Sequence, residues 1–284
     1  MGSGKYVESA KLYRELVTEI PGNTGLLMNL AMAQHMAGQD KEAIGNFEVV
    51  LKTQPLAFPV LTMAGSSYLR LGQHAKAIPL LQRALQVEPK NADVRQMLGV
   101  AYAMTGEDLR LQRRHADAIV AVKKGLAIEP NDLRLRLELA AAVYGSHDYA
   151  AAEALLRKLP PTPDVNFMLG DSLLNQQKAD AAIPFFVKAI EGDPQFLPAH
   201  ASLGRAYVTA GMYAAAIPHL EKAAELDNDG SLHYQLAQSY RASARTADAA
   251  RAMKRYQELN SKAKAASPGG PGRQARPSKP VRSR

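Results

Sequence analysis

Residues 58–91 read FPVLTMAGSSYLRLGQHAKAIPLLQRALQVEPKN, and the pattern within this stretch decides the fold. Leu61, Ala64 and Tyr68 are spaced at i, i+3 and i+7, which places them on one face of an α-helix. Gly72 follows, where a positive φ is expected, and Pro89 ends the stretch. Between these two residues lies a second apolar face, formed by Ala77, Leu80, Leu81, Ala84 and Leu85. The stretch therefore predicts two short helices joined by a tight turn.

The pattern recurs about every 34 residues from one end of the chain to the other. One pair of short helices cannot bury both of its faces, so consecutive pairs are expected to stack into one continuous core. The recurrence predicts a leader at 1–3, a half repeat at 4–23 with Gly4 at its turn, and seven full repeats. The full repeats are expected at 24–57, 58–91, 92–132, 133–162, 163–196, 197–229 and 230–262.

This order of residues resembles the tetratricopeptide repeat (TPR), and the resemblance covers about residues 4–262. It is carried by Ala64-Gly65, Tyr68, Gly72, Ala77-Ile78 and Pro89, and by the residues at the same places in the other repeats. The resemblance implies an all-α solenoid of antiparallel helix pairs that winds as a right-handed superhelix. It also implies that the first helices line a concave groove, which in this family commonly binds peptides or extended segments of partner proteins.

Two repeats differ in length from the others. The third is seven residues longer, close to two helical turns, and the insertion is expected to lengthen its second helix, with Gly106 at the turn. The fourth is four residues shorter. Its start, LRLRLEL, alternates like a β-strand, but its place in the repeat predicts a first helix. Its second helix is expected to end at Leu159, before Pro160.

The insertion in the third repeat carries three arginines, Arg110, Arg113 and Arg114. We expect them to project from one edge of the solenoid as a basic knob. Two interpretations stay open. The cluster is a solvated helix end, as exposed charge clusters usually are, or it contacts an acidic patch of a partner outside the groove.

Methionine is concentrated at the positions that face the groove in TPR proteins, and seven of the ten methionines take such positions. Met28, Met32 and Met36 form an i, i+4, i+8 stripe beside the packing face of one helix. Methionine is flexible and suits surfaces that accept varied apolar partners; alternatively, these side chains only fill space between closely wound repeats. By the resemblance, the expected groove consists of Met28, Asn29, Met32, Met36, Met63, Ser66, Arg70, Met97, Val100, Met104, Leu137, Tyr144, Phe167, Met168, Asp171, Leu174 and Arg205.

The sequence contains no arrangement that predicts catalysis, a metal site or a cofactor. Residues 2–5 (GSGK) look like the end of a phosphate-binding loop but lack its upstream glycine, its strand and the Ser or Thr after the lysine. The seven histidines have no HxxxH or HExxH spacing and are expected at the surface or in turns. TPR domains that bind a C-terminal carboxylate pair Lys with Asn at inner positions, and no such pair occurs here.

Composition separates a nearly neutral body from a basic tail. The chain has 284 residues, 46% of them hydrophobic and 22% charged, and no apolar run approaches the ~18 residues of a transmembrane helix. The net charge is +8, of which residues 261–284 carry +7. Residues 263–284 are rich in Gly, Pro, Ser and basic residues and are expected to be disordered. We expect a soluble protein, without separating the cytoplasm from the periplasm.

The sequence favours a non-catalytic scaffold that binds an extended or helical apolar segment of a partner protein, with no small-molecule substrate. Two alternatives stay open: a recognition or regulatory arm of a larger enzyme or assembly, and an adaptor to nucleic acid or another anionic surface through the tail. The half repeat bears on the first alternative, because its uncovered helix is either part of a longer array or a natural cap. An apolar face exposed between Tyr6 and Ile20 would favour the larger assembly.

Overall fold

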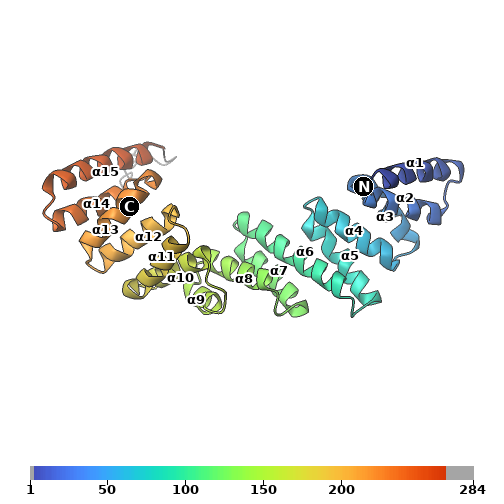
Figure 1. Ribbon diagram of the computed structural model, residues 1–284, viewed down its shortest axis with the longest axis horizontal. Coiled ribbons are helices and arrows are strands. Elements are labelled where there is room, and N and C mark those ends of the chain that lie inside the picture. The colour runs from blue at the N-terminus through green and yellow to red at the C-terminus, as the bar shows by residue number, and fades with distance from the viewer. Residues whose placement is uncertain (1–2, 267–284) are drawn as a thin grey trace, which may run out of the picture. The chain divides into compact units, whose positions relative to one another are not determined.

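A computed structural model describes residues 3–266, and within this range the chain forms fifteen α-helices, one 3₁₀ turn and no β-strand. The chain divides into two compact units, Met1–Leu159 and Pro160–Arg284, which we call unit 1 and unit 2. Figure 1 labels the helices of both units in chain order. The predicted all-α solenoid of helix pairs is confirmed.

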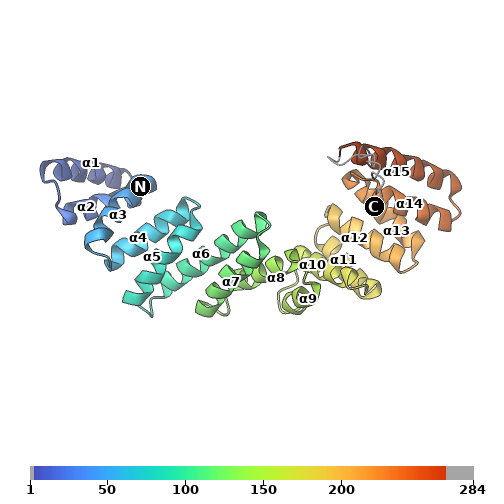
Figure 2. The ribbon, with the colours of Figure 1, turned by 180° about the vertical axis from the view of Figure 1, so that it is seen from behind.

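Unit 1 contains the single helix α1 followed by four helix pairs. Both views show each of these helices beside its neighbour in the chain (Figures 1 and 2). The segment LRLRLEL is helical, as its place in the repeat predicts. The helices are α1 (Ser3–Glu19), α2 (Thr24–Met36), α3 (Asp40–Thr53), α4 (Phe58–Arg70), α5 (His74–Val87), α6 (Ala92–Leu111), α7 (His115–Ile128), α8 (Leu133–Gly145) and α9 (Tyr149–Leu156).

Unit 2 contains three further helix pairs, again with each helix packed on the next. A 3₁₀ turn, η1 (Ala224–Leu226), follows the fourth helix of this unit. The last helix reaches Ala266, so residues 263–266 are helical and the expected disorder from 263 onward is wrong for them; the rest of the predicted tail lies outside the described residues. The helices are α10 (Pro163–Asn175), α11 (Ala179–Gly192), α12 (Leu197–Thr209), α13 (Tyr213–Ala223), α14 (Ser231–Ala242) and α15 (Thr246–Ala266).

Each helix pair turns at one residue in the left-handed region of φ. In the pair α4/α5 this residue is Gly72, with φ 68°, as predicted. The backbone N–H of Gln73 donates to the carbonyl of Tyr68 at 2.9 Å, which satisfies a carbonyl at the helix end. The turn residues in chain order are Gly38, Gly72, Arg113, His147, Gln177, Gly211 and Ala244, with φ between 57° and 78°.

In several of the pairs, close packing depends on a glycine in the first helix. A Cβ added at Gly65 would lie 2.7 Å from Cδ2 of Leu81, a fully buried residue of α5. Gly170 meets the ring of Phe186 and Gly204 meets Leu220 in the same way in unit 2. In each case the large side chain lies sixteen residues after the glycine. The helices of a pair approach closely because a side chain is absent at this contact.

The insertion in the third repeat lengthens the first helix, not the second, which corrects the sequence-based expectation. α6 has 20 residues, whereas α2, α4 and α8 each have 13. Gly106 is buried inside α6, and a Cβ there would collide with Val122 of α7, sixteen residues later. Gly106 is therefore the packing glycine of its pair, and Arg113, with φ 59°, takes the turn position.

The two ends of unit 1 also differ from expectation. α1 begins at Ser3, so Gly4 lies inside a helix rather than at a turn. α9 ends at Leu156, three residues before the predicted Leu159.

None of the helices within residues 3–266 combines the length and the apolar character needed to cross a bilayer.

We expect Gly65→Ala to lower the free energy of unfolding by about 1–3 kcal/mol, because the new methyl group overlaps a buried leucine that has little room to move. Gly45→Ala is the matched control: Gly45 is an exposed residue of α3 with no atom within 4 Å of an added Cβ. It should raise helix stability by about 0.5–1 kcal/mol. Urea denaturation followed by circular dichroism measures both. Equal effects of the two variants would contradict the close-packing account.

Candidate functional site

The first helices of consecutive pairs contact one another in both units. In unit 1, α2 contacts α4, α4 contacts α6 and α6 contacts α8; in unit 2, α10 contacts α12 and α12 contacts α14. Consecutive second helices in the described part of the chain do not contact one another to this extent. The first helices therefore form a continuous surface in each unit, which we call the first-helix face.

The structure places the predicted groove residues on helices that build these faces. Every one of the seventeen is partly or fully exposed. Each unit therefore carries its own set of accessible side chains. Unit 1 holds Met28, Asn29, Met32 and Met36 on α2, Met63, Ser66 and Arg70 on α4, Met97, Val100 and Met104 on α6, and Leu137 and Tyr144 on α8; unit 2 holds Phe167, Met168, Asp171 and Leu174 on α10, and Arg205 on α12.

The methionines of unit 1 differ in how far they are packed against the buried core. Met28, Met32 and Met63 pack against a buried cluster that includes Phe47. Met36, one turn further along α2 than Met32, is 46% exposed. Both interpretations of the methionine stripe therefore have support, because part of it fills space beside the core while its end faces solvent.

On the first-helix face of unit 2, Phe167 packs against two other aromatic rings. The Phe167 ring lies 6.1 Å from that of Phe186 and 5.1 Å from that of Phe196, measured between centroids. Phe167 and Leu174 pack against the buried cluster around Phe186. Arg205 donates to Ser202 Oγ at 2.8 Å, and its Nη2 lies 3.9 Å from Asp171 Oδ1. The charged residues here contact each other at the edge of an apolar cluster.

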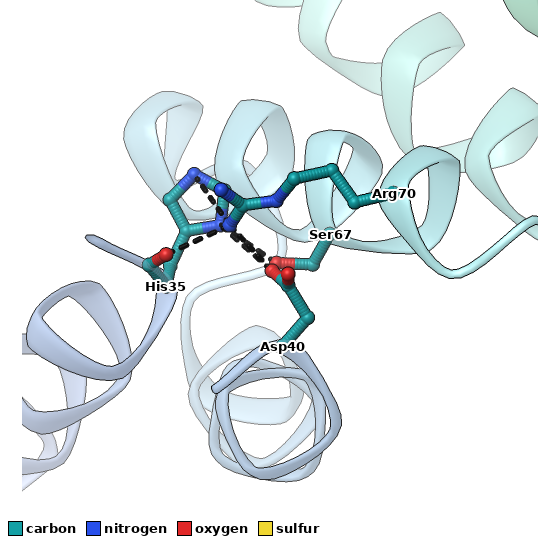
Figure 3. Close-up of polar contacts among 4 residues, drawn as sticks. All are labelled: His35, Asp40, Ser67 and Arg70. Atoms are coloured by element: carbon teal, nitrogen blue, oxygen red, sulfur yellow. Dashed lines mark hydrogen bonds and ion pairs between the residues drawn. The ribbon is translucent and has the colours of Figure 1, made fainter. Parts of the chain in front are cut away.

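A polar cluster joins the first two helix pairs of unit 1 (Figure 3). It consists of His35 at the end of α2, Asp40 at the start of α3, and Ser67 and Arg70 on α4. Arg70 Nη2 donates to Asp40 Oδ1 at 2.5 Å and to the His35 carbonyl at 2.7 Å. His35 Nδ1 lies 2.7 Å from Ser67 Oγ and 2.6 Å from Arg70 Nη2. The cluster ties the turn of one pair to the first helix of the next.

The surroundings of His35 disfavour its charged form on balance. His35 Nδ1 lies close to the positively charged Arg70 and, at 3.3 Å, to Asp40 Oδ1. Burial lowers the pKa of His35 below 6.5 and the charge of Arg70 lowers it further, while Asp40 acts in the opposite direction. The Asp40 side chain is only 8% exposed. Its ion pair with Arg70 compensates the buried negative charge of its carboxylate.

A second ion pair joins the third and fourth helix pairs of unit 1. Arg110 Nε donates to Glu138 Oε1 at 2.8 Å, and the Glu138 side chain is 11% exposed. Burial raises the pKa of Glu138, and the hydrogen bond and charge of Arg110 oppose that rise. Asp108, also in the lengthened part of α6, contacts His74 Nδ1 at 2.8 Å. The added turns of α6 therefore connect to the pairs on both sides.

The three arginines of the expected basic knob do not lie together on an extended second helix. Arg110 is on α6 and paired with Glu138, and Arg113 is the turn residue. Arg114 pairs with Asp117 at 2.8 Å across the start of α7. Their placement on the second helix is wrong because the inserted turns belong to α6. A contact with an acidic partner stays a proposal for Arg113 and Arg114 only.

Two histidines expected at the surface are buried. His35 is 8% and His200 is 5% exposed. In unit 2, His200 Nδ1 lies 2.9 Å from His219 Nδ1, with the rings stacked, and burial lowers the pKa of both. Within residues 3–266 no three His, Cys, Asp or Glu side chains are placed to hold a metal ion.

We expect Arg110→Met to lower the free energy of unfolding by about 1–3 kcal/mol, because it leaves the buried Glu138 carboxylate without its charged donor. Arg114→Met is the control, since Arg114 and Asp117 are both more than half exposed and such pairs contribute about 0–1 kcal/mol. Chemical denaturation at neutral pH and low salt distinguishes them. A loss no larger than that of the control would show that Glu138 tolerates the change.

Stability should also depend on pH through His35. Because its pKa is lower in the folded than in the unfolded chain, the unfolded chain binds the proton first as the pH falls. The free energy of unfolding should therefore decrease below pH 6.5. His35→Gln should remove part of this dependence, while the His200–His219 pair contributes equally to both proteins. Urea midpoints between pH 5 and 8 measure the difference; parallel pH profiles would contradict it.

Known proteins resemble this chain in sequence and fold. It is 25% identical over 220 residues to a peroxisomal targeting signal receptor of Eremothecium gossypii, covering 76% of this chain and 37% of the receptor. It is also 25% identical over 276 residues to anaphase-promoting complex subunit 7 of Arabidopsis thaliana, covering 85% and 49%. The chain thus spans less than half the length of these two relatives.

A solved structure supports the fold. The C-terminal part of a TPR repeat-containing protein from Cytophaga hutchinsonii superposes with a TM-score of 0.57 at 16% identity, covering 82% of this chain and 95% of the other. The tetratricopeptide repeat family model matches residues 68–108, 109–164 and 173–229, which together exceed half of the chain. These segments include helix pairs from both units. The chain belongs to the tetratricopeptide repeat family.

Proposed function

We propose that the first-helix face of unit 1 binds an apolar segment of a partner protein, extended or helical, and that the chain acts as a scaffold rather than an enzyme. Proteins of this family generally mediate interactions between proteins. The relatives above carry the names of a receptor and of a subunit of a complex, and both names describe binding to other molecules. This supports a binding role without identifying the partner.

The observation that carries the proposal is the accessible apolar set across four contacting helices. Met36 on α2 is 46% and Leu137 on α8 is 40% exposed, and Met63 and Met104 between them are partly exposed. Large apolar side chains grouped on one surface favour protein contact. Methionine adapts its shape to different apolar partners at low cost, so this surface suits a flexible or variable segment.

Polar groups at the same surface favour orientation of the segment. Arg70 is held by Asp40 and His35 but keeps a side chain 44% exposed. It lies at the C-terminal end of α4, as Met36 does on α2. A fixed cation beside an apolar stripe can pair with an acidic residue of the bound segment and so set its direction.

A second candidate function, the recognition arm of a larger assembly, has one observation in its favour. α1 exposes Leu12 (56%) and Leu16 (38%), one turn apart on one side of the helix, and Ile20 (52%) follows directly after its last residue. Such a stripe fits a further helix packed against α1. The third candidate, an adaptor through the basic tail, depends on residues that lie almost wholly outside those described.

A photo-crosslinking residue in place of Met36 or Leu137 should capture a partner from cells that express the full chain. The control position is Val49 on the second helix α3, whose 47% exposure matches that of Met36. Equal exposure makes the comparison depend on the surface and not on accessibility. The proposal predicts a partner at the first two positions and not at the third.

With the captured partner purified, Met36→Asp combined with Leu137→Asp should weaken binding by at least about tenfold, since two buried apolar contacts of 1–2 kcal/mol each are lost. Val49→Asp should leave the affinity unchanged. Circular dichroism should show unchanged helix content, because both residues lie outside the buried core. Met32 is unsuitable for this test because it packs against the core. Equal weakening by the Val49 variant would contradict the proposed face.

A further inference from the structure

Two adjoining pockets lie in unit 1, among the helices and turns of the pairs α6/α7 and α8/α9. The first has a volume of about 440 Å³ and lies among α7, α8 and α9. Its apolar walls come from Ile119, Val143 and Leu155. Ala151 and Ala154 of α9 also line it, and their side chains end at Cβ, which leaves the space between the helices open. An apolar group of a ligand would gain burial here.

The second pocket lies at the turns of the same two helix pairs and has a volume of about 640 Å³. Its lining includes Arg113, Arg114, His115 and His147. Ser146 lines both pockets, so the basic pocket and the apolar pocket meet at this residue. Both volumes fall within the ~300–1,000 Å³ typical of small-molecule sites.

The charges around the two pockets leave a cationic excess. Asp117 in the basic pocket is paired with Arg114 at 2.8 Å. Asp148 in the apolar pocket caps α9 by accepting from the N–H of Ala151 at 3.1 Å. Arg113 lines the basic pocket and Lys123 lines the apolar pocket. Neither side chain has an ion-pair partner within the described residues. Together the two linings hold three cations, Arg113, Arg114 and Lys123, and two carboxylates, Asp117 and Asp148, which leaves a net charge of +1.

His115 adds a polar group that the protein itself does not satisfy. Its Nδ1 is buried and has no hydrogen-bond partner in residues 3–266. The ring lies against Gly145, where an added Cβ would be 2.6 Å from Nδ1. His115 also lines the basic pocket, and a neutral imidazole keeps one N–H that can donate to an anion.

Arg113 is at a position where its residue type costs stability. It is the turn residue with φ 59°; of the six equivalent turns, three are glycine (38, 72 and 211) and three are His147, Gln177 and Ala244. A left-handed conformation costs a non-glycine residue about 1–2 kcal/mol. At this turn the arginine side chain lines the basic pocket, where a glycine would offer no cation.

We propose that the two pockets together bind a small amphipathic anion, an aliphatic chain with a carboxylate or phosphate at one end. The chain occupies the pocket among α7, α8 and α9, and the anionic group lies between Arg113 and His115, near His147. The α7 N-terminus adds partial positive charge at that end. None of the residues that line the two pockets is among the predicted groove residues, so the site is distinct from the surface proposed to bind a protein partner.

The test uses the full chain, with octanoate and octyl phosphate as probes in isothermal titration. Acetate and inorganic phosphate supply the anion alone, and octanol supplies the chain alone. The proposal predicts that an amphipathic probe binds at least tenfold more tightly than either of its halves. The stronger of the two probes identifies the headgroup as carboxylate or phosphate. If octanoate and octyl phosphate bind no more tightly than octanol, the proposal is overturned.

Two variants locate the site. Arg113→Gly removes the guanidinium and suits the positive φ, so it should keep or raise stability while lowering the affinity for the amphipathic probe at least fivefold and leaving octanol binding unchanged. Ile119→Gln should weaken octanol and the amphipathic probe alike. The matched controls are Gln177→Gly, at the same kind of turn in unit 2, and Val120→Gln, an exposed neighbour on α7; neither should change binding.

Thermal unfolding of each variant separates loss of the site from loss of the fold. Weakened binding in Arg113→Gly at unchanged or raised melting temperature supports the proposal. Probe binding that survives both Arg113→Gly and Ile119→Gln, in proteins that melt like the parent, would place the ligand elsewhere and overturn it.

Discussion

The contact between a small residue of a first helix and a large residue of its partner helix is the constraint on which the structure depends. Gly65 meets Leu81, Gly106 meets Val122, Gly170 meets Phe186 and Gly204 meets Leu220, each over a spacing of sixteen residues. This contact sets how closely two helices lie, and therefore where the next pair can pack. Each first-helix face is a row of first helices whose positions are set by these contacts with their second helices.

Polar clusters add specificity between neighbouring pairs. His35, Asp40 and Arg70 join the first pair to the second, and Arg110 with Glu138 joins the third to the fourth. In a linear array each pair contacts only its neighbours, so such links contribute to the interface terms that stabilise the whole. Buried charges at these links are costly if one partner is removed, which makes the register between pairs selective.

The sequence was sufficient to predict the fold, because glycine spacing, apolar periodicity and proline positions all repeat in phase. The insertion in the third repeat was assigned to the wrong helix because both Gly99 and Gly106 fit the small-residue position, and a shift of seven residues preserves the apolar face. The decisive fact, that Gly106 opposes Val122, is a contact between helices. The polar clusters were missed for a related reason: His35 and Ser67 are thirty-two residues apart, and no local pattern marks their pairing. The two pockets are likewise lined by residues from several helices and turns, so no single segment of the sequence predicts them.

The left-handed turn residues have a consequence for motion. Hairpins that turn at Gly38 or Gly72 adopt this geometry without strain, whereas those that turn at Arg113, His147 and Gln177 hold a disfavoured conformation. Opening such a hairpin releases that strain, so its local unfolding free energy is smaller than its buried area alone implies. Fluctuations should therefore be distributed unevenly along the array, with the α6/α7, α8/α9 and α10/α11 hairpins exchanging their turn amide hydrogens sooner than the α2/α3 and α4/α5 hairpins.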